Sequence, residues 1–534
     1  MSQLVCGRED RTPKIGYLVR PIGIAGGAHG IVAGVHPRPR RCPHMSMVHL
    51  RSAAALALVL LAAGCARAPA RQAPPNIVLI VADDLGSADT GAYGGQQTAT
   101  PHIDRLASEG IRFTQAYGHT VCAPSRSTLM TGTHLGHTPV RANTGGVPLR
   151  PEDVTIAEIL EAAGYATGGY GKWGLGEVGT PGVPERQGFD EFFGYYHQIH
   201  AHEHFPAFLY RNSERVELPG NRGFYDGPFG EGRGVGPIPP VDPATGQARQ
   251  FAHYQIVERM KAFIRDNRER PFFAYGAWTP PHSRWELPED DPAWQLYKDK
   301  PWPLPAKVAA AFISMVDRHV GEIVALIDEL GLTERTLVIF ASDNGGLASL
   351  NRQPLQSNGV LRGGKTMLYE GGLRVPFIAR WKGTIAPGVS DHITYFPDVL
   401  PTLAEIAGVA DQVPDVVDGI SLVPTLLGPE AAGRAQEQHE YLYWEDADID
   451  WKEVRYLEQE TLRQAVRAGD WKAIRPAPGA PLELYNLRTD PGEQHDVAAD
   501  HPEVVARLAR VMDEARLPTP PQIEPERVGG RPYR

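Results

Sequence analysis

Cysteine is scarce in this chain, with four residues in 534. Cys6 and Cys42 lie near the N-terminus and Cys65 follows a short apolar run, so Cys122 stands alone in the main body. A lone cysteine cannot form an internal disulfide, and the stability of this body must therefore come from its hydrophobic core. Such a cysteine is usually a small buried apolar side chain. The residues around Cys122 indicate a chemical role instead.

An excess of positive charge is also missing. The 53 Lys and Arg residues face 63 Asp and Glu residues, a net charge of −10, which excludes a nucleic-acid-binding protein that works through bulk charge. The 57 Gly and 48 Pro residues indicate many loops, while the 42% apolar fraction is that of a globular protein. Because single hydrophobic cores stop growing near about 250 to 300 residues, this length predicts one large domain and a smaller one.

The apolar run Ser52–Ala63 is too short to span a membrane and has the pattern of a signal peptide. It leads into the sequence LAAGC at residues 61–65, which resembles a bacterial lipoprotein cleavage box. That resemblance implies an exported, periplasmic protein tethered by a lipid on Cys65, with ordinary signal cleavage as the alternative. Residues 1–44 carry no export signal, so we expect the true start at Met45 or Met47.

Short apolar runs alternate with helical patterns along the rest of the chain, which predicts an α/β sheet with helices on its faces. We expect strands over residues 76–81, 271–278 and 336–341 with a fourth before 170–174, and helices over 101–109, 155–164, 253–267 and 306–330. Polar or basic residues follow directly after each of the four strands. Since ligands in open α/β sheets bind outside the carboxyl ends of the strands, these residues are expected to converge.

Two of these strand ends carry pairs of oxygen ligands, Asp83 with Asp84 and Asp343 with Asn344. Adjacent carboxylates in a closed site repel each other unless a cation lies between them, and oxygen ligands favour a hard divalent ion, Ca²⁺ before Mg²⁺. Each pair alone is typical of a cap on the following turn or helix. Two pairs at equivalent strand ends favour the metal site.

The segment 120–132, TVCAPSRSTLMTG, places a cysteine, a proline and Arg126 on one short stretch. It resembles the Cys-x-Pro-Ser-Arg signature of the type I sulfatases, in the alkaline-phosphatase-like superfamily. In that family the cysteine is oxidised after translation to Cα-formylglycine, and the hydrated aldehyde is the nucleophile. The resemblance implies that a formylglycine-generating maturation enzyme converts Cys122, and that the unprocessed thiol is inactive.

The resemblance covers roughly residues 75–515, and the family's other motifs follow in order. It implies catalytic roles for Cys122, Arg126, Lys172, His282 and Lys365, and metal ligands at Asp83, Asp84, Cys122, Asp343 and Asn344. The implied activity is hydrolysis of a sulfate monoester, on a sulfated small molecule or a saccharide. A phosphonate or phosphate-ester hydrolase of the same superfamily, and a lipid-anchored binding protein without catalysis, are the alternatives.

In the mechanism that this resemblance implies, a carboxylate takes the proton of the formylglycine hydroxyl that attacks sulfur, and we expect Asp343 to be that carboxylate. His282 or Lys365 would protonate or shield the leaving oxygen. The second hydroxyl of the sulfated diol would then allow expulsion of sulfate and return of the aldehyde.

The implied fold is a large mixed sheet sandwiched by helices, with a smaller C-terminal antiparallel sheet and one helix. The expected divisions are a leader with signal peptide over 1–64, a linker over 65–74, the catalytic domain over 75–428, the C-terminal subdomain over 429–516 and a tail over 517–534.

One position departs from the family pattern. The family commonly reads Gly-Lys-Trp-His-Leu-Gly, and here Gly174 stands in place of the histidine. We predict that His202, in the tract HQIHAHEH at residues 197–204, replaces it, with residues 188–194 as a packed hinge that brings the tract over the Lys172 loop. A solvated His-rich loop and a Zn²⁺-binding tract are the alternatives.

Two further segments are predicted to shape the substrate pocket. Residues 226–247 are rich in Gly and Pro without any period, and we expect an irregular loop there. Residues 285–305 are rich in Trp, Pro and acids, and aromatic side chains in such a loop would suit the faces of sugar rings.

Overall fold

The computed structural model describes residues 74–144, 147–225, 234–352, 354–450 and 455–520. The chain divides into two units, residues 1–71 and residues 72–534, and the described residues all belong to the second. The predicted signal peptide, the lipidation site Cys65, the start codon and the end of the tail lie outside the described residues. Within the ranges described, no helix combines the length and apolar character that a bilayer crossing requires.

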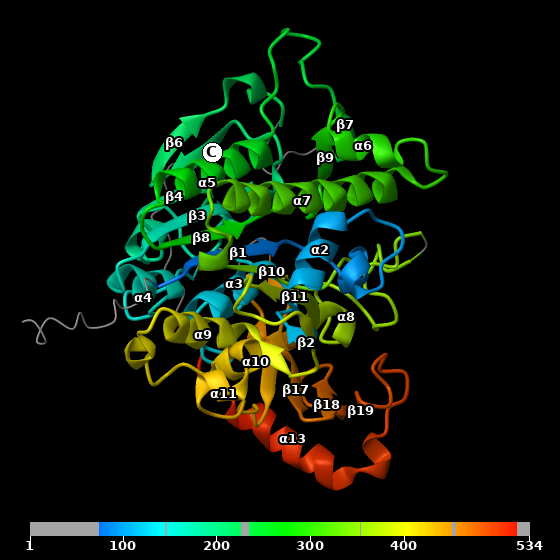
Figure 1. Cartoon of the computed structure of the whole chain (residues 1–534). Helices are drawn as coiled ribbons and strands as arrows, with labels where there is room; N and C mark the ends of the chain where they lie inside the picture. Colours follow the sequence, from blue (N-terminus) through cyan, green and yellow to red (C-terminus); the bar gives the residue numbers. More distant parts are fainter. Residues whose placement is uncertain (1–73, 145–146, 226–233, 353, 451–454, 521–534) are drawn as a thin grey trace, which may run out of the picture. The chain divides into compact units, whose positions relative to one another are not determined.

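An eleven-stranded mixed sheet forms the centre of the second unit, as predicted (Figure 1). Its middle consists of parallel neighbours in the order β10 (Thr336–Ser342), β1 (Asn76–Ala82), β8 (Phe272–Ala277), β3 (Ala166–Lys172) and β4 (Glu191–Tyr195). Toward one edge follow β11 (Arg374–Arg380), antiparallel to β10, then β2 (Ile111–Tyr117), β12 (Gly388–Ser390) and β13 (Thr394–Tyr395). Toward the other edge lie β5 (Phe208–Arg211) and β6 (Glu214–Glu217).

Helices cover both faces of this sheet. Strand β1 shows why, because Val78 and Ile80 belong to one hydrophobic cluster whereas Ile77 and Leu79 belong to the other. One face packs against α2 (Pro101–Glu109), α5 (Ala252–Asp266) and α7 (Leu304–Glu329), and the other against α3 (Cys122–Thr131), α4 (Ile156–Ala162) and α9 (Val399–Ile406). The predicted helices are confirmed, and the capping box of Thr155 and Glu158 opens α4.

The C-terminal part forms the predicted antiparallel sheet with one helix. Its strands are β14 (Leu442–Asp446), β17 (Arg463–Ala468), β18 (Trp471–Arg475) and β19 (Glu483–Asn486), and its helix is α13 (Pro502–Glu514). One face of this sheet packs on α13, and the other packs against residues of the main sheet and its loops, including Tyr117 and Leu373. Short elements complete the chain: α6 (Pro292–Tyr297), α8 (Glu370–Leu373), α10 (Val423–Leu427), α11 (Pro429–Ala432), α12 (Glu458–Thr461), β15 (Ile449–Asp450) and β16 (Arg455–Tyr456).

Two expectations about loops are wrong in part. The segment 226–247 contains β7 (Val235–Ile238), which pairs in parallel with β9 (Trp285–Pro288), so it is not wholly irregular. Trp285 and Trp294 are buried against α7 in a hydrophobic cluster and cannot stack on a sugar, whereas Trp302 is only partly buried. The expected hinge over 188–194 is also different, because most of it forms strand β4 beside β3.

Candidate active site

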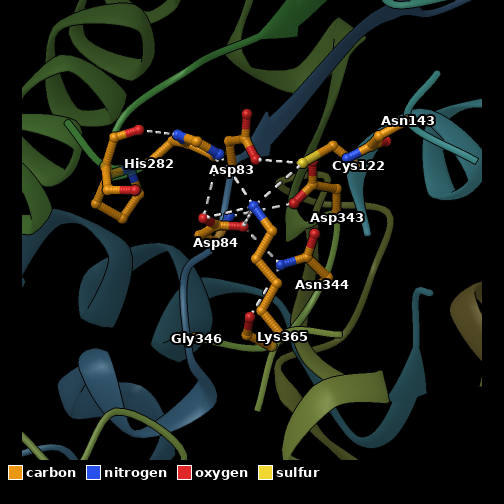
Figure 2. A network of polar contacts seen from close by, with 12 residues as sticks. Asp83, Asp84, Cys122, Asn143, His282, Asp343, Asn344, Gly346 and Lys365 are labelled. Carbon is orange, nitrogen blue, oxygen red and sulfur yellow. Dashed lines mark hydrogen bonds and ion pairs between the residues drawn. The ribbon is translucent and has the colours of Figure 1, made fainter. Parts of the chain in front are cut away.

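Cys122 is the first residue of α3, and its side chain is fully buried. The thiol Sγ donates a hydrogen bond to Oδ1 of Asp83 at 3.0 Å (Figure 2). The next backbone N–H, that of Ala123, donates to Oδ1 of Asn143 at 2.9 Å, which satisfies one of the free amides at the helix N-terminus. Burial raises the pKa of the Cys122 thiol, and the neighbouring Asp83 carboxylate raises it further, so an unmodified thiol stays protonated here.

The two predicted oxygen pairs lie side by side because β1 and β10 are parallel neighbours in which Ala82 is paired with Ser342. The backbone N–H of Asp84 donates to Oδ1 of Asp343 at 3.2 Å, and Nδ2 of Asn344 donates to Oδ1 of Asp84 at 2.8 Å. Asp84 has a φ of +67°, a left-handed conformation that Asp tolerates better than most residues. The turn after β1 therefore directs Asp84 toward the end of β10.

Each of the three buried carboxylates has its own cationic partner. The shortest contacts are Lys172 Nζ to Asp83 Oδ2 at 2.7 Å, Arg126 Nη2 to Asp343 Oδ2 at 2.9 Å, and Lys365 Nζ to Asp84 Oδ1 at 2.8 Å. Lys172 ends β3, Arg126 lies on α3, and Lys365 belongs to the loop before α8. Lys365 keeps 11% of its side chain exposed, so the cluster reaches solvent there.

Burial and the neighbouring charges move the pKa values of Asp83 and Asp343 in opposite directions. Burial alone would raise the pKa of Asp83, but Lys172, together with His282, Arg126 and Lys365, holds it well below its usual range. The pKa of Asp343 is raised to about 7 by burial and by the negative charge of Asp83 beside it.

His282, in the turn after β8, joins the same cluster. Its Nε2 lies 3.0 Å from Lys365 Nζ and 3.5 Å from Oδ2 of Asp84. Burial lowers the pKa of His282 to about 4, and the positive charge of Lys365 adds to this effect. The ring of His202 stacks on that of His282, with centroids 4.1 Å apart and planes 19° from parallel. The Nε2 of His202 is buried and has no hydrogen-bond partner.

The other histidines of the 197–204 tract have different surroundings. His197 lies 3.3 Å from a carboxylate oxygen of Glu177, His200 packs on Tyr195, and His204 lies 3.3 Å from the backbone oxygen of His282. His202 is thus the member of the tract whose ring faces the ring of His282, and the tract is not a solvated loop.

The residues at the strand ends fit a divalent cation. Ligand atoms of Asp83, Asp84, Cys122 and His282 all lie within 4.8 Å of one another. Oδ1 of Asn344 is buried and has no hydrogen-bond partner, although the amide Nδ2 of the same side chain is bonded. An unpartnered buried amide oxygen beside carboxylate oxygens is the donor set that a hard cation requires. All five predicted ligands converge here, and His282 lies among them.

A second group, His134, His137 and Asp418, also has ligand atoms close together. Nδ1 of His134 accepts a hydrogen bond from the backbone N–H of Gly136 at 3.1 Å, so the neutral ring carries its proton on Nε2 and has no lone pair there. Nδ1 of His137 lies 2.9 Å from Oδ2 of Asp418. This group is a structural hydrogen-bond network.

Sequence reasoning missed two residues and misplaced one contact. Asn143 caps Ala123, and Nε2 of Gln198 donates to the backbone oxygen of Asn143, yet neither residue belongs to a recognisable motif. The carboxylate in hydrogen-bond contact with Cys122 is Asp83, whereas the oxygens of Asp343 are bonded to Arg126 and to the backbone N–H of Asp84.

Two family models match the chain. One, described as Sulfatase, matches residues 75–409, and the other, described as N-sulphoglucosamine sulphohydrolase, C-terminal, matches residues 363–517. Arylsulfatase A of Homo sapiens is 36% identical over 496 residues, which covers 85% of this chain and 89% of the relative. An N-acetylgalactosamine-6-O-sulfatase of Bacteroides thetaiotaomicron is 30% identical, with 83% of this chain and 93% of the relative covered.

The fold also matches that of a solved structure. The crystal structure of Ps i-CgsB in complex with k-i-k-neocarrahexaose superposes with a TM-score of 0.68 at 26% identity, over 86% of this chain and 96% of the other. Matches of this extent, together with the convergence of the motif residues, place the chain in a family. This protein belongs to the type I sulfatases of the alkaline-phosphatase-like superfamily and is a sulfuric ester hydrolase.

Proposed function

We propose that Cys122 acts in its formylglycine form and that the hydrated aldehyde attacks the sulfur of the substrate. This proposal rests on the position of the Cys122 Sγ, which lies 3.0 Å from Oδ1 of Asp83 and 3.6 Å from Nζ of Lys365. An oxygen of the formylglycine hydrate would take the place of Sγ. Asp83 Oδ1 already accepts the hydrogen bond from this position, so Asp83 is the carboxylate placed to take the proton of the attacking hydroxyl.

The cationic residues then act on the sulfate group. As the hydrate oxygen bonds to sulfur, the bond between sulfur and the ester oxygen breaks, and the leaving oxygen takes a proton from the ammonium of Lys365, whose Nζ lies 3.0 Å from Nε2 of His282. Lys172 and Arg126 offset the negative charges of Asp83 and Asp343, so that an anionic sulfate group can bind beside these carboxylates. Loss of the proton from the second hydroxyl expels sulfate and restores the aldehyde.

We propose that the cation is Ca²⁺, held by Asp83, Asp84, Asp343 and Asn344 and by the residue at position 122, because carboxylate and amide oxygens dominate this set. When bound, such an ion supplies a positive charge that draws electron density from the attacking hydroxyl and from a sulfate oxygen.

Replacing Asp84 with Asn should lower the affinity for Ca²⁺ at least about tenfold, since one charged ligand is lost. Asn tolerates the left-handed backbone at this position, so the turn itself should persist. Isothermal titration with Ca²⁺ measures the change, and Asp317→Asn, a buried Asp on α7 outside the cluster, is the matched control. Equal affinity in the two variants, or native protein without a divalent ion, would contradict the assignment.

We propose a sulfated saccharide as the substrate. Supporting this are the relative named N-acetylgalactosamine-6-O-sulfatase and the superposed structure, which is a complex with k-i-k-neocarrahexaose. The similarity to arylsulfatase A makes an aryl sulfate the second candidate.

Purified protein should release inorganic sulfate from sulfated monosaccharides and oligosaccharides faster than from an aryl sulfate, and should turn over the matched phosphate esters poorly. Cys122→Ala should lower kcat by at least about 10³-fold, because the nucleophile is lost while only a small side chain is removed. Ion chromatography of released sulfate and phosphate measures both effects. Full activity of Cys122→Ala would refute the role of this residue, and faster phosphate release would favour the phosphohydrolase alternative.

His202 is proposed to act through His282, whose ring it covers. His202→Ala should lower kcat on the order of 10²-fold, by analogy with the loss of one charge-stabilising group, whereas His197→Ala should have a much smaller effect. Steady-state kinetics of the two variants, with melting temperatures as the control for folding, tests this difference. Similar small losses would show that His202 is only a packing residue.

A histidine at position 174 is expected to rescue the kcat of His202→Ala only in part. Gly174 has a φ of +77°, which strains any residue with a Cβ, although a Cβ there would meet Gln198 and Ala123 only at ordinary contact distances of 3.4 and 3.6 Å.

We propose that the protein is exported and tethered to a periplasmic membrane surface by a lipid on Cys65, on the basis of the LAAGC sequence after an apolar run. Cys65→Ser should move the protein from the membrane fraction to the soluble periplasmic fraction, as followed by fractionation and immunoblotting. Wild-type protein found wholly in the soluble fraction would favour ordinary signal cleavage.

A further inference from the structure

A fully buried group of charged residues lies between the C-terminal sheet and the loop that carries Lys365. Lys472, on β18, has its Nζ 3.0 Å from Oε1 of Glu370 and 2.8 Å from Oε1 of Glu493, and all three side chains have no exposed surface. On the other side of Glu370, the hydroxyl of Tyr117 donates to Oε2 at 2.7 Å. In the part of the chain that the structure describes, no hydrogen bond or ion pair joins these four side chains to the active-site residues Asp83, Asp84, Cys122, His282, Asp343 and Lys365.

Hydrogen bonds to the C-terminal part hold both ends of residues 362–371, the Lys365 loop. Glu370 comes five residues after Lys365, and its backbone N–H donates to Oε2 of Glu493 at 2.7 Å. Before Lys365, Arg362 donates through Nη1 to the backbone oxygen of Glu493 and to the hydroxyl of Tyr485, each at 3.0 Å. The N–H of Gly371 closes the loop by donating to the backbone oxygen of Arg362 at 2.8 Å.

The same C-terminal sheet also holds the segment that leads to Cys122. Nε1 of Trp444, on β14, donates to the backbone oxygen of Gly118 at 2.9 Å. The Lys365 loop contacts this segment as well, because the N–H of Thr366 donates to the backbone oxygen of Thr120 at 2.9 Å. The nucleophile segment and the Lys365 loop are therefore attached to one another and to the same sheet.

The buried ion pairs of Lys472 with Glu370 and Glu493 are not explained by a gain in the stability of the fold. Removing two carboxylates and an ammonium from water costs several kcal/mol per ion, and a buried ion pair seldom stabilises more than apolar residues of the same size. What a fully bonded buried group does provide is a single arrangement of the segments that it joins. Burial would raise the pKa of Glu370, but Lys472, with Arg374 and Arg467, holds it below its usual value.

We propose that Lys472 and Glu370 are positioning residues, through which the C-terminal sheet holds the Lys365 ammonium in place for binding the sulfate group. The inference rests on the proposed role of Lys365 and extends it, since it makes the C-terminal sheet part of the sulfate-binding machinery. A loop freed from this sheet would let Lys365 move relative to Asp84 and His282, and a displacement of about 1 Å in a catalytic group can cost about 10²-fold in rate.

The test uses the full-length protein and inorganic sulfate as a competitive inhibitor. Lys472→Met combined with Glu493→Gln removes one charge of each sign, so the net charge of the group is unchanged, and Glu370 keeps Arg374, whose Nη1 lies 3.6 Å from its Oε2. We expect the inhibition constant for sulfate to rise about tenfold and kcat/KM to fall about 10- to 100-fold. Lys472→Arg, which keeps the charge, should retain most of the affinity for sulfate.

Leu508→Ala is the matched control, because it destabilises the same sheet from its other face, where α13 packs. It should lower the melting temperature without changing the inhibition constant for sulfate. If the double variant does not fold, Tyr117→Phe decides the question. It removes the hydrogen bond to Glu370 and the one that the Tyr117 hydroxyl accepts from Arg467, leaves the charges of Lys472 and Glu370 in place, and should still weaken sulfate inhibition by several-fold.

The variant Lys365→Ala distinguishes a failure of the positioning role from a failure of the role proposed for Lys365 itself. If Lys365→Ala weakens sulfate inhibition while the double variant and Tyr117→Phe do not, the positioning role is overturned and the proposed role of Lys365 stands. Equal effects of the double variant and Leu508→Ala would also overturn it. If Lys365→Ala leaves sulfate inhibition unchanged, the role proposed for Lys365 fails, and the positioning role fails with it.

Discussion

Three carboxylates are buried next to one another at one edge of the central sheet, and the rest of the site depends on how their charge is balanced. Asp83, Asp84 and Asp343 would repel one another strongly in a dry interior, and each buried ion costs several kcal/mol unless it is paired. Lys172, Arg126 and Lys365 each supply one of the pairings, and each comes from a different part of the chain. The site is thus built from charge compensation between distant segments.

The parallel strands at the centre of the sheet make this compensation geometrically possible. The register of β1 against β10 brings the two oxygen pairs together, and the ends of β8 and β3 add His282 and Lys172. Gly171 shows how tightly these strand ends are packed, because a Cβ there would lie 1.9 Å from the backbone oxygen of Ala277 and its φ is +125°. The chain can bring Lys172 this close to β8 only with glycine before it.

The sequence predicts most of this arrangement, because buried strands of an α/β sheet are recognisable as short apolar runs. The residues directly after parallel strands lie at the same edge of the sheet, so their place in the sequence is enough to predict that they converge. The sequence does not predict Asn143 or Gln198, which lie in loops whose path depends on tertiary contacts. The ion pair of Lys472 with Glu370 joins residues 102 positions apart, and no local pattern indicates which distant charge a buried lysine will meet. Trp285 and Trp294 were expected at a pocket because composition does not distinguish an aromatic side chain in a loop from one in a core.

The central claim is that this charge-balanced pocket surrounds a formylglycine rather than a thiol. Mass spectrometry of the peptide that contains Cys122, taken from protein that is active in sulfate release, tests it most directly. The account predicts the mass of an aldehyde at position 122 and its reaction with a hydrazide. An intact thiol at position 122 in fully active protein would contradict it.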